Sequence, residues 1–482
     1  MFRRGSGATA AAPRRPDPDG LWSTQRWRTT TGVVSLVSLV AFEAMAVATA
    51  MPIAARELSG LGLYAWAFTG FGVTSLFSTA VAGQICDRRG PRLPFAAGVG
   101  LFALGLVIAG AAQSMLPFVL GRLVQGLGAG GIIVSVYVLV GLSYPDRLRP
   151  RIFSYLSAAW VLPAVIGPLV AGTLAENASW RWVFVGLLPL VVAPVLLLWP
   201  GLPGRPPDGG AAASGGRGPL AAFVLAAGVA MLQLGGGRVE HGHVVTGTVL
   251  AVVGLAGVAA AGRTLFPPGT GRLRRGLPSV VALRGVQAGA FIGTEAFLPL
   301  MLVEHRGLSA TAAGAVLTGA ALGWSAGSWW QGRPGIQADR GRLAVTGSCA
   351  VLVGLLITST AVSGDPAVPV LVGAFGWTVA GSGMGITFST LSVLLFRLSP
   401  EAEQGRNSAA LQMSDALGCV LTVGAAGVAY AALRDQGGLA FAVVFAGTAV
   451  VQLLGVFVAT RVTPAKGRDT PAPVTVGTGH AG

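Results

Sequence analysis

Long apolar segments, separated by short stretches that carry most of the basic residues, constrain the fold of this 482-residue chain more than any other feature. A helix needs about 20 predominantly apolar residues to cross a bilayer. Only 11% of the residues are charged, less than half the roughly 25% typical of a soluble domain. The sequence therefore predicts an all-α polytopic membrane protein with fourteen transmembrane segments, near residues 32–54, 63–83, 94–113, 117–143, 154–175, 183–203, 219–235, 244–262, 279–303, 308–331, 343–363, 369–396, 406–432 and 438–460.

The basic residues predict the orientation of these segments. If the amino terminus is inside, 26 of the 33 Lys and Arg residues fall in the tails and loops of the inner side. Cytoplasmic loops of membrane proteins carry such an excess. We therefore expect a multi-pass protein of a bacterial plasma membrane with both termini in the cytoplasm, and we interpret the net charge of +15 as topological rather than as a sign of nucleic-acid binding.

The sequence offers no constellation for catalysis or metal binding. Its three cysteines are scattered, and its four histidines fall in predicted tails and loops. These residues match neither a disulfide framework nor a metal site, and no phosphate-binding loop is present. We expect a protein that is not an enzyme, with no cofactor and no metal.

Two features repeat at one spacing and predict duplicated halves. The segments 83–88 and 335–340 both read Gly, three residues, Asp-Arg, and they lie 252 residues apart. The same offset carries Glu43, at the centre of the first segment, onto Glu295 in the ninth. Transporters are commonly built from such repeats. The predicted organisation is a tail (1–31), a six-helix bundle (32–203), two inserted helices with linkers (204–278), a second six-helix bundle (279–461) and a tail (462–482).

Five ionisable residues fall inside the predicted segments: Glu43, Arg122, Arg284, Glu295 and Asp415. Charges at such depth are costly and therefore mark functional sites. Burial favours the neutral acid and a neighbouring arginine favours the carboxylate, so a carboxylate between these influences can exchange protons near neutral pH. We predict that Glu43 carries the proton, that Asp415 or Glu295 is a second site, and that Arg122 is the fixed positive partner. Arg284, only five residues into its segment, is expected to reach the inner interface.

Structural interpretations of the same residues remain open. Glu43 would then form a polar contact between helices, and Arg122 would be a tether. Asp415 would pair with a serine of its own helix, and Glu295 would lie near the outer water.

Motifs along the chain resemble those of the major facilitator superfamily, and more narrowly its 14-helix drug:proton antiporter branch. The segment 83–92 is similar to the family's signature between helices two and three, and 122–129 to its helix-four motif. In helix five, 163–172 resembles the antiporter motif, although Pro163 and Ala171 stand where that pattern has Gly. Residues 43–52 and 180–184 resemble two further motifs of the branch.

The resemblance implies roles for these motifs. The loop motif implies a gating loop, with a counterpart in the second half: Gly83, Asp87, Arg88, Gly90, Arg92, Asp339 and Arg340. The antiporter motif implies a helix that keeps the transport pathway closed to leak, and its residues are Pro163, Gly167, Pro168 and Gly172. The two prolines predict a kink in this helix. The first-helix motif departs from the family, with Glu43 for Asp, Met45 for Thr and Ala48 for Asn, which predicts a more apolar cavity wall.

The resemblance also implies a major facilitator fold that exports hydrophobic or amphiphilic small molecules, such as drugs or antibiotics, in exchange for protons. Met45, Trp160 and Phe291 are candidates to line the substrate cavity, where aromatic rings hold organic cations. An exporter of one metabolite, such as an amino acid, a lipid or a self-made antibiotic, would share every motif and stays an alternative. A channel and a non-transporting sensor are the other classes considered. We expect a monomer whose partners are its substrate, protons and the lipid bilayer, with no nucleic acid.

Overall fold

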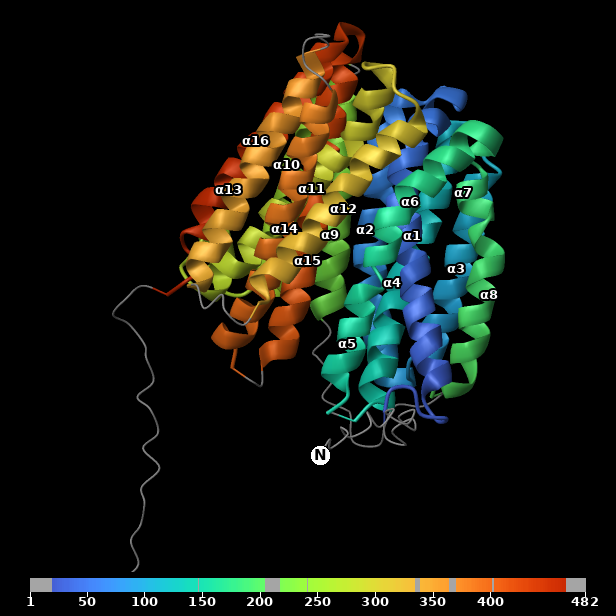
Figure 1. Cartoon of the computed structure of the whole chain (residues 1–482). Coiled ribbons are helices and arrows are strands. Elements are labelled where there is room, and N and C mark those ends of the chain that lie inside the picture. Colours follow the sequence, from blue (N-terminus) through green and yellow to red (C-terminus); the bar gives the residue numbers. More distant parts are fainter. Residues whose placement is uncertain are drawn as a thin grey trace, which may run out of the picture.

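The computed structural model describes residues 20–145, 147–203, 217–240, 242–333, 339–363, 370–400 and 403–464, and every regular element in these ranges is helical. The long helices run roughly parallel or antiparallel to one another (Figure 1). They are α1 (Trp27–Glu57), α2 (Tyr64–Arg89), α3 (Arg92–Gly110), α4 (Met115–Ser143), α5 (Arg149–Ala158), α6 (Val161–Leu174), α7 (Trp182–Val185), α8 (Leu187–Leu198), α9 (Arg217–Glu240), α10 (Val244–Leu265), α11 (Leu277–Glu304), α12 (Ala310–Gln331), α13 (Arg340–Ser359), α14 (Val370–Leu398), α15 (Gln404–Leu433) and α16 (Gly438–Ala459).

The helix lengths agree with a membrane-spanning fold. Within the described residues, thirteen helical segments are long and apolar enough to cross a bilayer. The remaining predicted segment corresponds to α12, whose 22 residues are also long enough but include many small and hydroxyl side chains. The prediction of an all-α polytopic protein is therefore confirmed.

The helices form two bundles and an inserted pair. In the first bundle, α1–α8, both α2 and α3 pack against α4; in the second, α11–α16, both α12 and α13 pack against α14 in the same way. The bundles meet along α2 and α15, α6 and α12, and α1 and α11. Of the inserted helices, α9 packs against α2 and α15, where Thr69 donates a hydrogen bond of 2.8 Å to Gln233, and α10 packs against α9. Figure 1 shows the two bundles side by side.

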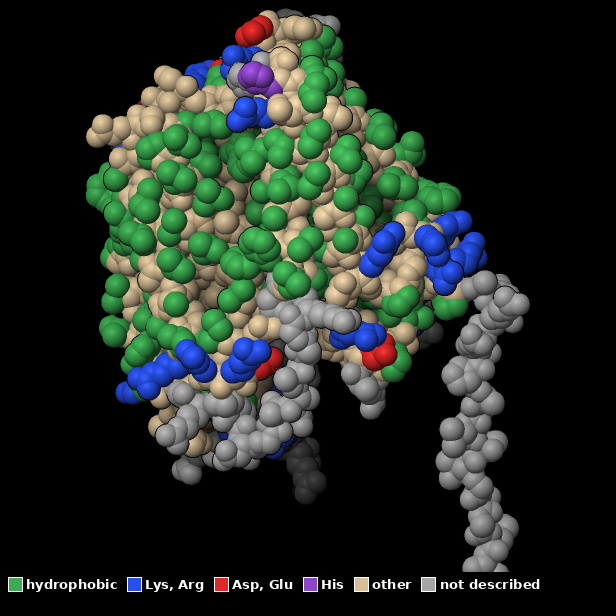
Figure 2. All heavy atoms as spheres, turned by 180° about the vertical axis from the view of Figure 1, so that it is seen from behind, with side chains coloured by type: hydrophobic (Ala, Val, Ile, Leu, Met, Phe, Trp, Pro, Cys, Tyr) green, Lys and Arg blue, Asp and Glu red, His purple; other side chains and the backbone are tan. Residues whose placement is uncertain are grey.

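The two ends of the molecule differ in charge. We call the end at which α1 begins and α2, α4 and α14 end the basic face, and the opposite end, where α1 and α11 end, the distal face. Figure 2 shows Lys and Arg side chains gathered toward the lower side of the view, and a smaller mixed group of basic, acidic and His side chains at the top. Exposed hydrophobic side chains cover the surface between them, as expected of a lipid-facing belt.

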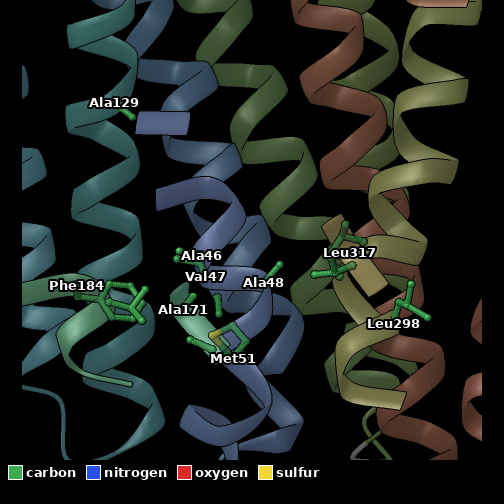
Figure 3. Packing of buried hydrophobic residues seen from close by; sticks show 14 of the residues in the cluster. Ala46, Val47, Ala48, Met51, Ala129, Ala171, Phe184, Leu298 and Leu317 are labelled. Atoms are coloured by element: carbon green, nitrogen blue, oxygen red, sulfur yellow. The ribbon is translucent and has the colours of Figure 1, made fainter. Parts of the chain in front are cut away.

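Small residues let the helices of the core approach closely. Figure 3 shows Ala46, Val47 and Met51 of α1 beside Ala171 of α6, all of them buried. Between the bundles, Gly172 of α6 lies against α12 so closely that a Cβ atom there would stand 2.7 Å from the Ala310 carbonyl oxygen. Close approach of this kind is typical of small residues in membrane helices.

The fifth predicted segment is broken rather than gently kinked. It consists of α5 and α6, which are separated at Ala159 and Trp160. Pro163 has no N–H to bond to the Ala159 carbonyl, and its ring clashes with that carbonyl, so a break at this turn is expected. Pro168 lies inside the continuous helix α6. Of the two prolines from which the kink was predicted, Pro163 therefore accounts for the break.

Candidate functional site

A buried ion pair lies at the centre of the first bundle. Glu43 of α1 is fully buried and Arg122 of α4 is 3% exposed; the Arg122 Nη1 donates to the Glu43 Oε1. The same nitrogen donates to the Gln125 side chain at 2.7 Å, and the Arg122 Nε donates to the Ala67 carbonyl of α2 at 2.9 Å. The guanidinium carbon also lies 4.5 Å from the centre of the Phe71 ring. Three helices thus fix the position of this arginine.

Two buried polar atoms of this cluster are unsatisfied within the described residues. The Glu43 Oε2 and the Gln125 Nε2 are buried and have no hydrogen-bond partner in the described part of the chain. An unsatisfied buried polar atom costs about 1–3 kcal/mol. One oxygen of Glu43 is thus held by Arg122, while the other can still accept a hydrogen bond.

A second ion pair lies in the second bundle and corrects the prediction for Arg284. That residue was expected to extend to the membrane interface, but its Nε donates to the Asp415 Oδ1 of α15 at 2.8 Å. The Arg284 guanidinium carbon lies 3.5 Å from the centre of the Phe388 ring of α14. Ser414, the helix neighbour of Asp415, instead donates to the Val281 carbonyl. The partner of Asp415 is thus an arginine, not a serine.

Aromatic rings continue from this ion pair through the second bundle. Phe388 lies edge-on to Trp324 of α12 at 4.9 Å, and Trp324 lies edge-on to Phe291 of α11 at 5.9 Å. Phe291 stacks on Trp377 of α14 at 4.4 Å. Phe291, a predicted cavity-lining residue, is only 3% exposed and belongs to this aromatic cluster.

Glu295 differs from Glu43 although the repeat relates them. It lies on α11, is partly buried, and has no hydrogen-bond or ion-pair partner among the residues that the structure describes. The sequence contains the reason, because the position 252 residues after Arg122 is Ala374. The second bundle therefore has the acid of the repeat but not its arginine.

The other predicted lining residues lie around the broken helix. Met45 contacts α6 at Gly167, where a Cβ atom would stand 3.4 Å from the Met45 Cβ. Trp160 lies at the break between α5 and α6 and is 40% exposed. Their role in substrate binding stays a prediction.

The loop motif of the first bundle forms a helix end. Asp87 and Arg88 lie in the last turn of α2. Gly90 ends that helix with φ of 78°, a conformation that favours glycine. The Arg92 guanidinium lies 4.7 Å from the centre of the Trp199 ring. At Gly83, a Cβ atom would meet nothing within 4 Å, so close packing does not explain that glycine.

Its counterpart in the second bundle is similar. Asp339 caps α13 by accepting a hydrogen bond of 2.8 Å from the Gly341 N–H, and Arg340 donates to the Gln331 side chain at 2.7 Å. Residues 334–338 of this motif lie outside the described residues. Both motifs shape the basic face, and their gating role stays a prediction.

Polar contacts join the two bundles on the distal side. They are the ion pair of Arg56 with Glu304, the hydrogen bonds from the Thr311 N–H and hydroxyl to Glu176, the bond of 2.8 Å from the Tyr64 hydroxyl to the Ala296 carbonyl, and the bond of 2.9 Å from the Thr318 hydroxyl to the Val165 carbonyl. Residues of both bundles, among them Arg56, Ser59 and Glu304, also line a distal pocket of about 620 Å³. The bundles are therefore held together at the distal face.

Sequence reasoning identified the acids but missed Gln125 as a partner of Arg122 and Arg284 as the partner of Asp415. Gln125 follows Arg122 by three residues, within one helical turn, and that spacing was a signal. Arg284 was named but left out of the mechanism. No group of three His, Cys, Asp or Glu residues suited to a metal ion occurs in the part of the chain that the structure covers.

Known proteins with similar sequences are transporters. A family model described as Major Facilitator Superfamily matches residues 33–423. The multidrug transporter protein MdtP of Bacillus subtilis is 28% identical over 179 residues, which cover 37% of this chain and 33% of that protein; matches to the first relatives thus span about a third of their length. A probable multidrug-efflux transporter of Mycobacterium tuberculosis is 26% identical over 397 residues, 78% of this chain and 82% of that protein.

Solved structures support the same fold. An auto-inhibited peptide transporter of the POT family matches with a TM-score of 0.67 at 15% identity, over 92% of this chain and 99% of that one. A D-xylose–proton symporter matches with a TM-score of 0.64 at 15% identity, over 92% and 98%. Because this family model covers most of its length, the chain belongs to the Major Facilitator Superfamily; it is a multi-pass membrane protein of a family of transporters rather than of enzymes.

Proposed function

We propose that this transporter exports hydrophobic or amphiphilic small molecules, drugs and antibiotics among them, in exchange for protons. The buried pair of Glu43 and Arg122 is the observation that carries the proposal. Protonation of Glu43 would break its ion pair, while Arg122 would keep its bonds to Gln125 and to the Ala67 carbonyl. The cluster therefore has two arrangements that differ by one proton, as a coupling device requires. The names of the relatives, a multidrug transporter and a multidrug-efflux transporter, favour this substrate class.

The distribution of charge supports an orientation in the membrane. We propose that the basic face lies in the cytoplasm of a bacterium and the distal face outside, with both termini in the cytoplasm, because basic residues concentrate on the inner side of membrane proteins. The bundles are joined at the distal face, so this conformation would open toward the cytoplasm. We propose that a single chain is the transporting unit.

Transport would then proceed by rocking of the bundles against each other. Glu43 would take up a proton when the distal face is open and lose it when the basic face is open. Each proton that enters supplies about 2.3 kcal/mol per 100 mV of membrane potential and about 1.4 kcal/mol per pH unit. Two protons would sustain a substrate gradient of several hundredfold or more. Asp415 and Glu295 are the candidates for the second proton, and the loop and antiporter motifs would control opening.

An exporter of one self-made compound is the second candidate. One relative, 34% identical over 167 residues, is named a transporter of the acurin A biosynthesis cluster of Aspergillus aculeatus. Transport of a single compound from a diverse panel would favour this candidate.

Proton-driven uptake into inverted vesicles tests the proposal. Wild-type protein should accumulate members of a panel of hydrophobic cations, zwitterions and neutral compounds when the lumen is acidic, and Glu43→Gln should abolish the response to pH. Glu403→Gln is a matched control, because Glu403 pairs with Arg406 at the exposed basic face, and it should transport normally. Unchanged pH-driven uptake by Glu43→Gln would contradict the assignment of the proton site.

A further inference from the structure

The ion pair of Arg284 and Asp415 joins α11 to α15 and is partly exposed. On α15, Ser414 and Gly418 face α11, whereas Val420 faces α2 at Gly72. At 3.6 residues per turn, Asp415 points between these two directions. The Asp415 side chain is 29% exposed and that of Arg284 is 13% exposed. Both side chains are thus partly exposed, unlike the enclosed pair of Glu43 and Arg122.

The Arg284 guanidinium is held in place but is only partly used. Its Nε binds Asp415 and its face lies on the Phe388 ring. Neither Nη atom has a hydrogen-bond partner within the described ranges, and arginine does not deprotonate in proteins. Two contacts therefore fix the plane of this group, while the N–H bonds on its other edge remain available.

That free edge has a chemical preference. The planar fork of a guanidinium matches the two oxygens of a carboxylate, and charge-assisted bonds of this kind are roughly twice as strong as neutral ones. Because the group is already fixed, little side-chain entropy is lost on binding. Asp415 balances the charge when no ligand is bound, so the empty site carries no net charge.

The neighbouring surface suits the rest of such a molecule. Phe388 and Trp324 are partly exposed and lie edge-on to each other beside the guanidinium. On α11, Phe291 lies seven residues after Arg284, and therefore on the same face two turns away. Aromatic rings here offer an apolar surface next to one fixed positive charge.

From this geometry we propose that Arg284 binds the carboxylate of an amphiphilic substrate whose apolar or aromatic part lies along Phe388 and Trp324. The inference rests on the proposed export function and names a substrate class for it, namely aromatic or apolar carboxylates and zwitterions. Asp415 is the positioning residue that holds the guanidinium.

Binding of a matched pair of probes to the purified full-length protein in nanodiscs tests the inference. The probes are pyrenebutyrate and its neutral amide, which share the same aromatic body and differ in the charged group. Wild type should bind the carboxylate about 10- to 100-fold more tightly than the amide. Arg284→Gln should remove this preference and leave amide binding within about threefold, and Arg284→Lys should retain part of it.

The control variant removes a comparable group elsewhere. The Arg333 guanidinium also lies on an aromatic ring, 3.8 Å from the centre of Trp329, a side chain that is 67% exposed. Arg333→Gln should therefore keep the wild-type preference. A preference that persists in Arg284→Gln, or a wild type that does not prefer the carboxylate, would overturn the inference.

Transport of a lipophilic cation separates this inference from the function on which it rests. If wild type exports tetraphenylphosphonium in a proton-dependent manner but shows no carboxylate preference, only the Arg284 site is wrong. If the preference is present and depends on Arg284, but no compound moves with protons, the carboxylate site stands and the proposed exchange with protons is wrong.

Discussion

The environment of Arg122 strongly restricts substitution. This residue is a buried cation with partners on α1, α2 and α4. Removing one member of a buried ion pair costs about 3–5 kcal/mol, because the other charge loses its partner. Glu43 would become such a charge if Arg122 were neutralised. The same pair can therefore be essential for coupling and dispensable for folding.

This distinction predicts the stability of three variants. Arg122→Gln should lower the unfolding free energy by about 3–5 kcal/mol, whereas the double variant Glu43→Gln with Arg122→Gln should recover most of that loss yet remain uncoupled. Unfolding midpoints in nanodiscs, measured together with pH-driven uptake, check both parts. The exposed pair of Glu403 and Arg406 is the comparison, for which the same double substitution should cost about 0–1 kcal/mol. A double variant as unstable as Arg122→Gln would contradict this account.

The sequence predicted which residues are costly to bury but not all of their partners. Depth along a segment can be read from the sequence, and it placed Glu43 at the centre of its segment, where the structure buries it. Arg284 and Asp415 are 131 residues apart, and their pairing depends on how α11 packs against α15. Nearness to the predicted start of a segment suggested that Arg284 would reach water, because that criterion ignores a partner on another helix.

At the scale of elements, the seam between α6 and α12 depends on glycine. A Cβ atom at Gly172 would lie 2.8 Å from the Thr311 Cα as well as close to the Ala310 carbonyl. These neighbours are backbone atoms, which cannot move aside as a flexible side chain would. Hydrogen bonds from Thr311 to Glu176 lie at the same seam.

Gly172→Val should therefore force the seam apart and shift the protein away from its distally closed conformation. The expected result is an increase of about tenfold or more in the labelling rate of a cysteine introduced at Ser59, in the distal pocket. Gly447→Ala is the control, because a Cβ atom there meets nothing within 4 Å, and it should label like the parent protein. An unchanged rate for Gly172→Val would show that the seam tolerates the added side chain.

The break between α5 and α6 gives a second prediction at this scale. With an N–H at position 163, the Ala159 carbonyl could accept a helical bond, so Pro163→Ala should join the two helices. Spin labels at Arg151 and Thr173, both exposed, should move apart as the helix straightens. Pro168→Ala, inside a helix that is already continuous, should leave this distance nearly unchanged.

At the scale of the whole molecule, the two bundles share a packing scheme but not their charges. Length, apolar segments and the 252-residue repeat predicted the shared scheme, because packing follows helix order and small residues. The charge arrangement follows individual substitutions, such as Ala374 at the position equivalent to Arg122. The first bundle thus holds an enclosed ion pair suited to a proton, while the second holds a partly open one suited to a ligand. On the proposed function, this asymmetry would place the principal proton site in the first half and the carboxylate-binding site in the second.

The distal contacts between these halves should stabilise the closed conformation jointly, since each one is weak by itself. Arg56 is 51% exposed and Glu304 23% exposed in their ion pair, and an exposed pair of this kind contributes only about 0–1 kcal/mol. Glu304→Gln alone should therefore change the labelling rate at position 59 by less than about fivefold. Adding Tyr64→Phe removes the bond from α2 to the Ala296 carbonyl of α11, and adding Thr318→Val removes the bond from α12 to the Val165 carbonyl of α6. The triple variant should open the distal face by about 10- to 100-fold. The charge swap of Arg56→Glu with Glu304→Arg should label like the parent, because it preserves the pair. If Glu304→Gln alone opened the distal face as far as the triple variant does, one ion pair rather than the distal contacts together would hold the closed conformation.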